Sequence, residues 1–121
     1  MSNEKQIEQE IQDKGLDAPR LTPDNIDSKI KAIRYTTGDK FDLAYCADDY
    51  GTCGSPQLTI CILSLENGFT VTGESACASP ENFDRIIGQK IAYENARNKI
   101  WQLEGYLLKE KLYQAELDKQ F

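Results

Sequence analysis

The sequence predicts an α+β fold, and three observations indicate it. Residues 58–65 form an apolar, β-favouring run, which is followed by Asn67-Gly68, a strong signal for a hairpin turn, and by the β-favouring residues 69–72. Thr22-Pro23 and Ser79-Pro80 each combine a helix N-cap with a proline at the first helical position. We therefore expect an N-terminal helix, a small central antiparallel sheet with an Asn-Gly hairpin, and two C-terminal helices.

The beginning of the chain is expected to form a polar arm, residues 1–19. Residues 4–14 are typical of a short helix with only Ile7 and Ile11 on its apolar stripe, and Gly15 to Pro19 end it. The rest of the chain, residues 20–121, is short enough to form a single α+β domain.

The middle of the chain predicts one helix followed by strands. The helix that starts at Pro23 is expected to continue to about Arg34, because Ile26, Ile30 and Ile33 follow helical spacing. Short strands are expected at residues 35–37 and 41–45, before a polar loop at 47–56.

The strand at residues 58–65 is apolar on both of its faces, so we expect it to be covered on both sides. A two-residue turn at Asn67-Gly68 would pair Leu63 with Thr72.

The C-terminal third predicts a helix from Pro80 to about Trp101 and another over 103–117, with a bend at residues 102–105. The last helix carries apolar side chains on more than one face, which favours self-association. The large apolar side chains of the first of these helices share one broad stripe: Phe83, Ile86, Ile87, Ile91, Tyr93, Ile100 and Trp101.

Charge and composition exclude several classes of function. The net charge of −6 argues against a DNA-coating protein, which normally carries a basic excess. Residues 83–121 hold 7 basic and 6 acidic side chains, against 7 and 14 in residues 1–82, so an anionic ligand would be drawn to the C-terminal third. The chain has no histidine, the usual general base at neutral pH. We therefore expect no catalytic residues and no enzyme activity.

The cysteine pattern predicts neither a metal site nor a disulfide framework. Cys46 and Cys53 do not have zinc-ligand spacing, and Cys77 lacks a nearby base that would make it a nucleophile. The charged N-terminus has no signal peptide, and no apolar run approaches the roughly 18 residues that cross a bilayer, so we expect reduced thiols, no membrane contact and a cytoplasmic location. We expect no cofactor and no metal.

Charged residues within the apolar stripe allow two interpretations. Lys90, Glu94 and Arg97 share that face, and charges on a buried face must be paired. They could form ion pairs centred on Glu94, or Lys90 and Arg97 could bind an anion such as phosphate. Phe83, beside Arg85 near the helix start, is the aromatic residue best placed to stack on a flat ring.

The run NGFTVTGESACASPENFDRIIGQKIAYENARNKIWQLEGYLLKEKL resembles a family of small tailed-phage and prophage proteins, over roughly residues 20–113. In length and order of elements the chain also resembles the first Thoeris anti-defence family. Members of that family are non-enzymatic sponges, which hide cyclic ADP-ribose isomers made by bacterial TIR enzymes; some also hold cyclic oligonucleotides made by CBASS cyclases.

The resemblance implies a phage anti-defence sponge in the host bacterial cytoplasm, assembled as dimers that build a hexamer. Its ligand would be a cyclic ADP-ribose isomer or another cyclic nucleotide, and the alternative is a phage protein that only docks on a protein partner. In such sponges the ligand is held by a stacking aromatic, an amide side chain and arginines of the C-terminal half, and in this chain Lys109 and Lys111 stand where arginines might be expected. The corresponding ligand-binding candidates are Phe83, Arg85, Lys90, Asn95, Arg97, Lys109 and Lys111.

Overall fold

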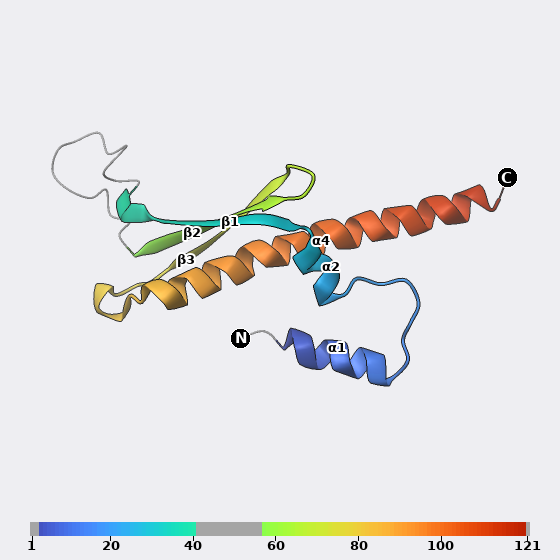
Figure 1. The fold of residues 1–121 in the computed structure, drawn as a ribbon, viewed down its shortest axis with the longest axis horizontal. Helices are drawn as coiled ribbons and strands as arrows, with labels where there is room; N and C mark the ends of the chain where they lie inside the picture. The colour runs from blue at the N-terminus through green and yellow to red at the C-terminus, as the bar shows by residue number, and fades with distance from the viewer. Residues whose placement is uncertain (1–2, 41–56, 121) are drawn as a thin grey trace. The chain divides into compact units, whose positions relative to one another are not determined.

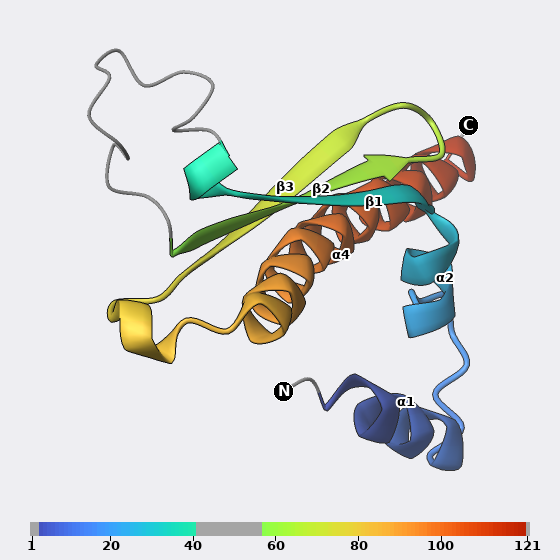
Figure 2. The same ribbon diagram turned by 60° about the vertical axis from the view of Figure 1, so that its left-hand side comes forward.

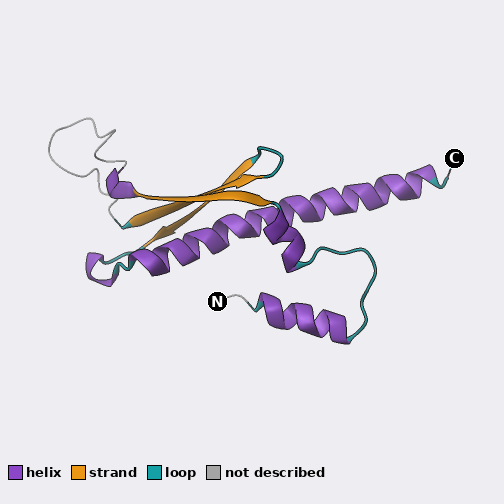
Figure 3. Ribbon diagram, in the orientation of Figure 1, coloured by secondary structure: helices purple, strands orange, loops and turns teal. Residues whose placement is uncertain are grey.

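The computed structural model describes residues 3–40 and 57–120, which form two compact units. One unit contains the residues up to Lys29 together with those from Ile100 onward, and the other spans Ile30–Lys99. The predicted strand at 41–45 and the loop at 47–56 lie outside the described residues. The observed class is α+β, with a three-stranded antiparallel sheet and helices toward both ends of the chain (Figure 1 and Figure 3).

The first unit begins with α1 (Glu4–Asp13) and continues to α2 (Pro23–Ser28). Gly15 follows α1 with φ of 66°, a left-handed conformation that favours glycine at a helix end. Thr22 caps α2 as the sequence predicts: its hydroxyl accepts a hydrogen bond from the Asn25 amide, and the Asn25 side chain accepts one from the Thr22 amide.

The expected continuation of this helix to Arg34 is wrong. The helix ends at Ser28, and β1 (Ile30–Thr37) follows. Ile30 and Ile33 belong to a strand that pairs antiparallel with β2 (Leu58–Leu65), with Ile33 opposite Leu63. Their spacing fits a helix, but β-branched side chains also suit a sheet, and the backbone bonds to β2 decide between the two.

The sheet has the order β1-β2-β3, with β3 (Thr70–Ala76) antiparallel to β2. Leu63 faces Val71 rather than Thr72, so the register expected from a two-residue turn is wrong by one residue. The Gly68 amide bonds the Leu65 carbonyl at 2.9 Å, and Gly68 has φ of 90°. This is the three-residue connection in which a glycine takes the left-handed position.

The C-terminal third forms a short 3-10 helix, η1 (Pro80–Asn82), and one long helix, α4 (Arg85–Asp118). The expected helix start at Pro80 is therefore wrong, and so is the break at residues 102–105. The Asp84 carboxylate accepts hydrogen bonds from the amides of Ile86 and Ile87 at 2.9 and 3.0 Å, so Asp84 is the N-cap. Nothing in the sequence at residues 102–105 forces a bend, because one glycine is tolerated inside a helix.

The first half of α4 crosses one face of the sheet through small residues (Figure 2). Gly88, Ala92 and Ala96, spaced four apart, are all buried. A Cβ built on Gly73 of β3 would lie 2.2 Å from the Ala96 amide nitrogen and 2.3 Å from the Ala92 carbonyl oxygen. Helix and strand therefore touch backbone to backbone, and only glycine fits on the strand.

Most of the predicted apolar stripe of large side chains is not the face that docks; Ile100 is its only fully buried member among the described residues. Ile86, Ile87 and Ile91 are 62%, 56% and 45% exposed. The sheet is also covered on one face only by the described elements of its unit: the α4 side of β2 is buried from Thr59 to Leu65 at alternate positions, while Ile60 and its neighbours on the other face are half-buried. The expectation of two covered faces is wrong for the described residues.

No helix of the described chain is long and apolar enough to span a bilayer.

Within the first unit, an ion pair and a further hydrogen bond hold α1 in place. The Arg20 guanidinium bonds both Glu8 carboxylate oxygens, at 2.6 and 2.9 Å, and the Trp101 indole donates to Glu4 at 3.1 Å. The hydrogen bond from Arg20, with a second from Gln12, lowers the pKa of Glu8 from 4.5 to about 2.

We expect acid to release α1. A carboxylate whose pKa is lowered on folding stabilises the fold above its unfolded pKa of 4.5, and this stability is lost as the pH falls from 4.5 to about 2. The fluorescence of Trp101, the only tryptophan, should change over that range. Glu8→Gln should give the changed signal already at pH 7. Lys14→Ala, which removes the exposed Lys14–Glu10 pair, is the control and should behave like wild type; an unchanged Glu8→Gln spectrum would contradict this role.

Candidate functional site

A partly open hollow of about 180 Å³ lies where the end of β1 meets the start of α4. All of its lining residues belong to the unit that spans Ile30–Lys99. It combines aromatic, cationic and hydroxyl side chains from two segments that are far apart in the sequence. The lining residues are Tyr35, Thr36, Thr37, Asp39, Lys40, Phe83, Arg85 and Gln89.

The start of α4 positions one wall of the hollow. Phe83 ends η1 in an extended conformation, with φ of −67° and ψ of 124°, and its ring is half-buried. The Asp84 cap then fixes the first turn of the helix. Arg85 is exposed, and among residues 3–40 and 57–120 no ion pair or hydrogen bond engages its guanidinium. Arg85 is therefore available to a ligand.

The end of β1 supplies the opposite wall. The Thr37 hydroxyl donates a hydrogen bond to the Asp39 carboxylate, which also accepts one from the Lys40 amide at 3.0 Å. The bond from Thr37, helped by that amide, holds the pKa of Asp39 below its ordinary value, against a smaller opposing effect of burial. Asp39 is thus ionised at neutral pH and orders the helical residues 38–40 that follow β1.

Tyr35 adds a hydroxyl that stays protonated. Burial, with smaller contributions from Cys61 and Tyr93, raises the pKa of the Tyr35 phenol above its ordinary value. The phenol can therefore donate a hydrogen bond at neutral pH. Tyr35 is 38% exposed, so part of the residue is accessible.

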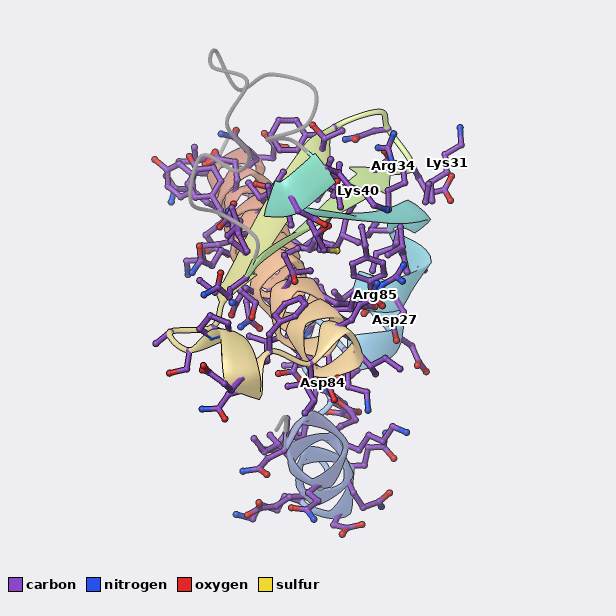
Figure 4. The ribbon with its side chains drawn as sticks, turned by 90° about the vertical axis from the view of Figure 1, so that its left-hand side faces the viewer. Asp27, Lys31, Arg34, Lys40, Asp84 and Arg85 are labelled. Atoms are coloured by element: carbon purple, nitrogen blue, oxygen red, sulfur yellow. The ribbon has the colours of Figure 1, made fainter. Side chains whose placement is uncertain are left out.

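The charges of the hollow favour an anion. Lys40 and Arg85 contribute two positive charges and Asp39 one negative charge; Figure 4 shows Lys40 at the end of β1 and Arg85 at the start of α4. Arginine can grip a phosphate through two parallel hydrogen bonds. Aromatic rings beside these cations can stack on a flat base. The arrangement can bind a phosphorylated, ring-containing molecule.

Two of the residues predicted for ligand binding, Phe83 and Arg85, line this hollow. The other five do not line it. Lys109 and Lys111 are exposed on the part of α4 that belongs to the other unit. The Asn95 amide donates to the Glu74 carbonyl of β3 at 2.8 Å, so it ties the helix to the sheet.

Lys90 and Glu94 are exposed rather than set into a buried stripe, and the described residues show no ion pair between them. The Lys90–Glu94 half of the ion-pair interpretation is therefore not supported, and the Glu94–Arg97 half stays a prediction. Arg97 is half-buried and has an interaction partner. Its role in ligand binding stays a prediction.

The sequence reasoning missed most of the β1 wall. Tyr35 and Thr37 were assigned to a short strand with no functional role, and Lys40 and Gln89 were not singled out. A usable signal is the segment Thr36-Thr37-Gly38-Asp39-Lys40, in which two hydroxyls end a strand and a glycine and a cation follow it.

Nucleophilic chemistry has little basis in the described residues. Burial raises the pKa of the Cys61 thiol, which is fully buried. Cys77 donates to the Ser79 carbonyl at 3.2 Å. Both thiols are free, and the described part of the chain contains no cluster of side chains suited to a metal ion. Cys46 and Cys53 lie outside the described residues.

The fold and the hollow fall within a region that matches a known family. Residues 21–112 match the phage protein (N4 Gp49/phage Sf6 gene 66) family. The chain belongs to this family. The match begins before α2 and ends within α4, so it includes every residue that lines the hollow and confirms the predicted likeness to phage proteins over roughly residues 20–113. No curated protein and no solved structure is significantly similar to the chain.

Proposed function

We propose that this phage-family protein is an anti-defence sponge that binds a cyclic ADP-ribose immune signal made by TIR enzymes and hides it without cleaving it. Cyclic oligonucleotides made by CBASS cyclases are a second ligand class. The observation that carries the proposal is the hollow in which Phe83 and Tyr35 lie beside the cations Lys40 and Arg85.

The chemistry of the ligand matches this lining. A cyclic ADP-ribose presents an adenine, two riboses and a pyrophosphate. An aromatic ring can stack on the adenine, the guanidinium of Arg85 can grip a phosphate, and the amide of Gln89 or the hydroxyl of Thr37 can bind a ribose. A hollow of about 180 Å³ accommodates one end of such a molecule, so the rest would extend beyond it.

The acid–base properties of the side chains in the hollow also suit a protein that holds its ligand without cleaving it. An enzyme that cleaves the ligand would need an acid or base tuned near neutral pH. The chain has no histidine, the Asp39 carboxyl has a lowered pKa, and the Tyr35 phenol has a raised one. These groups can hold a ligand, whereas none of them is poised to exchange a proton at pH 7.

Recovery of the ligand tests this proposal. Purified protein is mixed with a limiting amount of each cyclic ADP-ribose isomer, filtered to remove free ligand, and then heat-denatured. We expect chromatography of the released material to return the intact isomer in the amount first bound. A cleaved product that accumulates beyond one molecule per chain would instead identify an enzyme.

A protein-docking function is the second candidate, and the exposed apolar side chains of α4 favour it. Tyr106 and Tyr113 are 74% and 54% exposed, and Leu107 is 43% exposed. Monomeric proteins seldom expose such surfaces without a partner. Our proposal assigns the surface to a homo-oligomer in which dimers build a hexamer. Light scattering is expected to give a mass several times that of the 13.7 kDa chain, and a monomer without ligand binding would favour docking on another protein.

A further inference from the structure

The side chain of Gln89 is a polar group of the hollow that the described chain leaves without a partner. Gln89 lines the hollow and is half-buried. Among residues 3–40 and 57–120, no hydrogen bond engages its amide. A carboxamide places N–H donors beside a carbonyl acceptor in one plane. It is therefore suited to a ligand group that presents an acceptor next to a donor.

The Phe83 ring lies close to this amide. A Cβ built on Gly88, the residue before Gln89, would be 3.9 Å from the Cε2 atom of Phe83. The ring therefore packs against the helical turn that carries Gln89, and both side chains line the same hollow. A base that stacks on the ring has its edge within reach of the amide.

Arg85, labelled in Figure 4 at the start of α4, lies one helical turn before Gln89. Residues four apart share one face of a helix, and the rise between them is about 6 Å. In a nucleotide, one ribose separates the phosphate from the base. A phosphate at Arg85 and a base edge at Gln89 therefore correspond to the two ends of one nucleotide, and the Thr37 hydroxyl is left for the ribose.

We infer that Gln89 makes the hollow specific for adenine, through paired hydrogen bonds from its side-chain amide to the N6 amino group and the N7 atom of the base. This inference rests on the proposed function and names the residue that selects the base. Glutamine recognises adenine through the same pair of atoms in DNA. Guanine and hypoxanthine carry an oxygen at position 6 instead of the amino group, so the amide carbonyl would lose its partner.

Two nucleoside diphosphates of equal charge test the inference. Inosine diphosphate differs from adenosine diphosphate only in its base, which has an oxygen in place of the N6 amino group. By titration calorimetry we expect the wild-type chain to bind adenosine diphosphate roughly 5- to 150-fold more tightly, the discrimination that one bidentate contact to a base provides. The phosphate contacts are the same for both, so inosine diphosphate should still bind at millimolar concentration.

Variants of Gln89 show whether this residue is the cause. Gln89→Leu keeps a side chain of similar size without the amide, and Gln89→Ala removes the side chain beyond Cβ. Both variants should bind the two diphosphates with nearly equal affinity. Gln102→Leu makes the same change at an exposed glutamine of α4 that does not line the hollow, and it should keep the wild-type ratio.

Several outcomes would overturn the inference. Wild type that binds neither diphosphate, wild type that binds both equally, or a wild-type ratio in the Gln89 variants would each do so. A preference for inosine diphosphate would also overturn it, and would indicate that Arg85 faces the base, since guanidinium donors suit the acceptors N7 and O6.

The proposed function has a separate readout in the same titrations. If cyclic ADP-ribose isomers do not bind while adenosine diphosphate is preferred through Gln89, the proposed sponge function is refuted and the base specificity stands. If an isomer binds while the Gln89 variants keep the preference for adenosine diphosphate, the sponge function stands and the role of Gln89 is refuted.

Discussion

Replacing Gly73 with alanine is expected to lower the melting temperature of the protein by roughly 15 °C. The added Cβ would lie 2.2 Å from the Ala96 nitrogen and 2.3 Å from the Ala92 carbonyl oxygen, and both are backbone atoms of α4. No side-chain rotation can relieve this overlap, so the helix must move off the sheet. Overpacking of this kind costs about 3 kcal/mol, and each kcal/mol shifts the melting temperature of a small domain by about 4–8 °C.

Gly105→Ala is the matched control. A Cβ on Gly105 would meet nothing within 4 Å, and alanine favours a helix over glycine by about 1 kcal/mol. This variant should melt at or above the wild-type temperature in the same calorimetric scan. If Gly73→Ala melted as high as Gly105→Ala, the close contact between α4 and β3 would be refuted.

Loss of Arg85 is expected to weaken binding of a cyclic ADP-ribose by roughly 10- to 150-fold. The Arg85→Ala change removes a charge-assisted contact worth about 1.5–3 kcal/mol. Arg85→Lys should recover only part of the affinity, because lysine lacks the planar fork. Stability should stay unchanged, since no described contact of the folded chain uses this guanidinium.

Lys90→Ala controls for net charge. Lys90 is exposed on the same helix but does not line the hollow, so its loss changes the charge equally while leaving the contacts intact. We expect its affinity to stay close to that of wild type in the same titration. Equal losses for Arg85→Ala and Lys90→Ala would show that only long-range attraction matters and would remove Arg85 from the site.

The sequence correctly predicted the elements whose formation depends on residues close together in the chain. The Thr22–Pro23 start of α2 depends on neighbouring residues, and the structure places it as expected. The strand β2 has a strong apolar pattern and is found at residues 58–65. In contrast, Ile30 and Ile33 fit a helical and a strand pattern equally well, and their pairing with β2 is a long-range event that spacing cannot reveal.

The large apolar side chains of α4 do not reveal which face of the helix packs on the sheet. The helix approaches the sheet so closely that Gly88, Ala92 and Ala96 form the contact, and the larger Ile87 is turned outward. The sequence predicted only part of the lining of the hollow, again because long-range packing decides which residues meet there. Phe83 and Arg85 follow the Ser79-Pro80 signal closely. Tyr35 lies in the predicted strand 35–37, but it and Lys40 meet the start of α4 only through long-range packing.

Titration calorimetry of the wild-type protein with purified cyclic ADP-ribose isomers, beside Phe83→Ala, tests the proposed function most directly. Stacking of a base on the Phe83 ring contributes about 1–3 kcal/mol, so Phe83→Ala should bind roughly 5- to 150-fold more weakly. The account predicts saturable binding of at least one isomer by wild type and this loss in the variant. Absence of binding heat for every isomer with the folded wild-type protein, or equal affinities for wild type and Phe83→Ala, would contradict it.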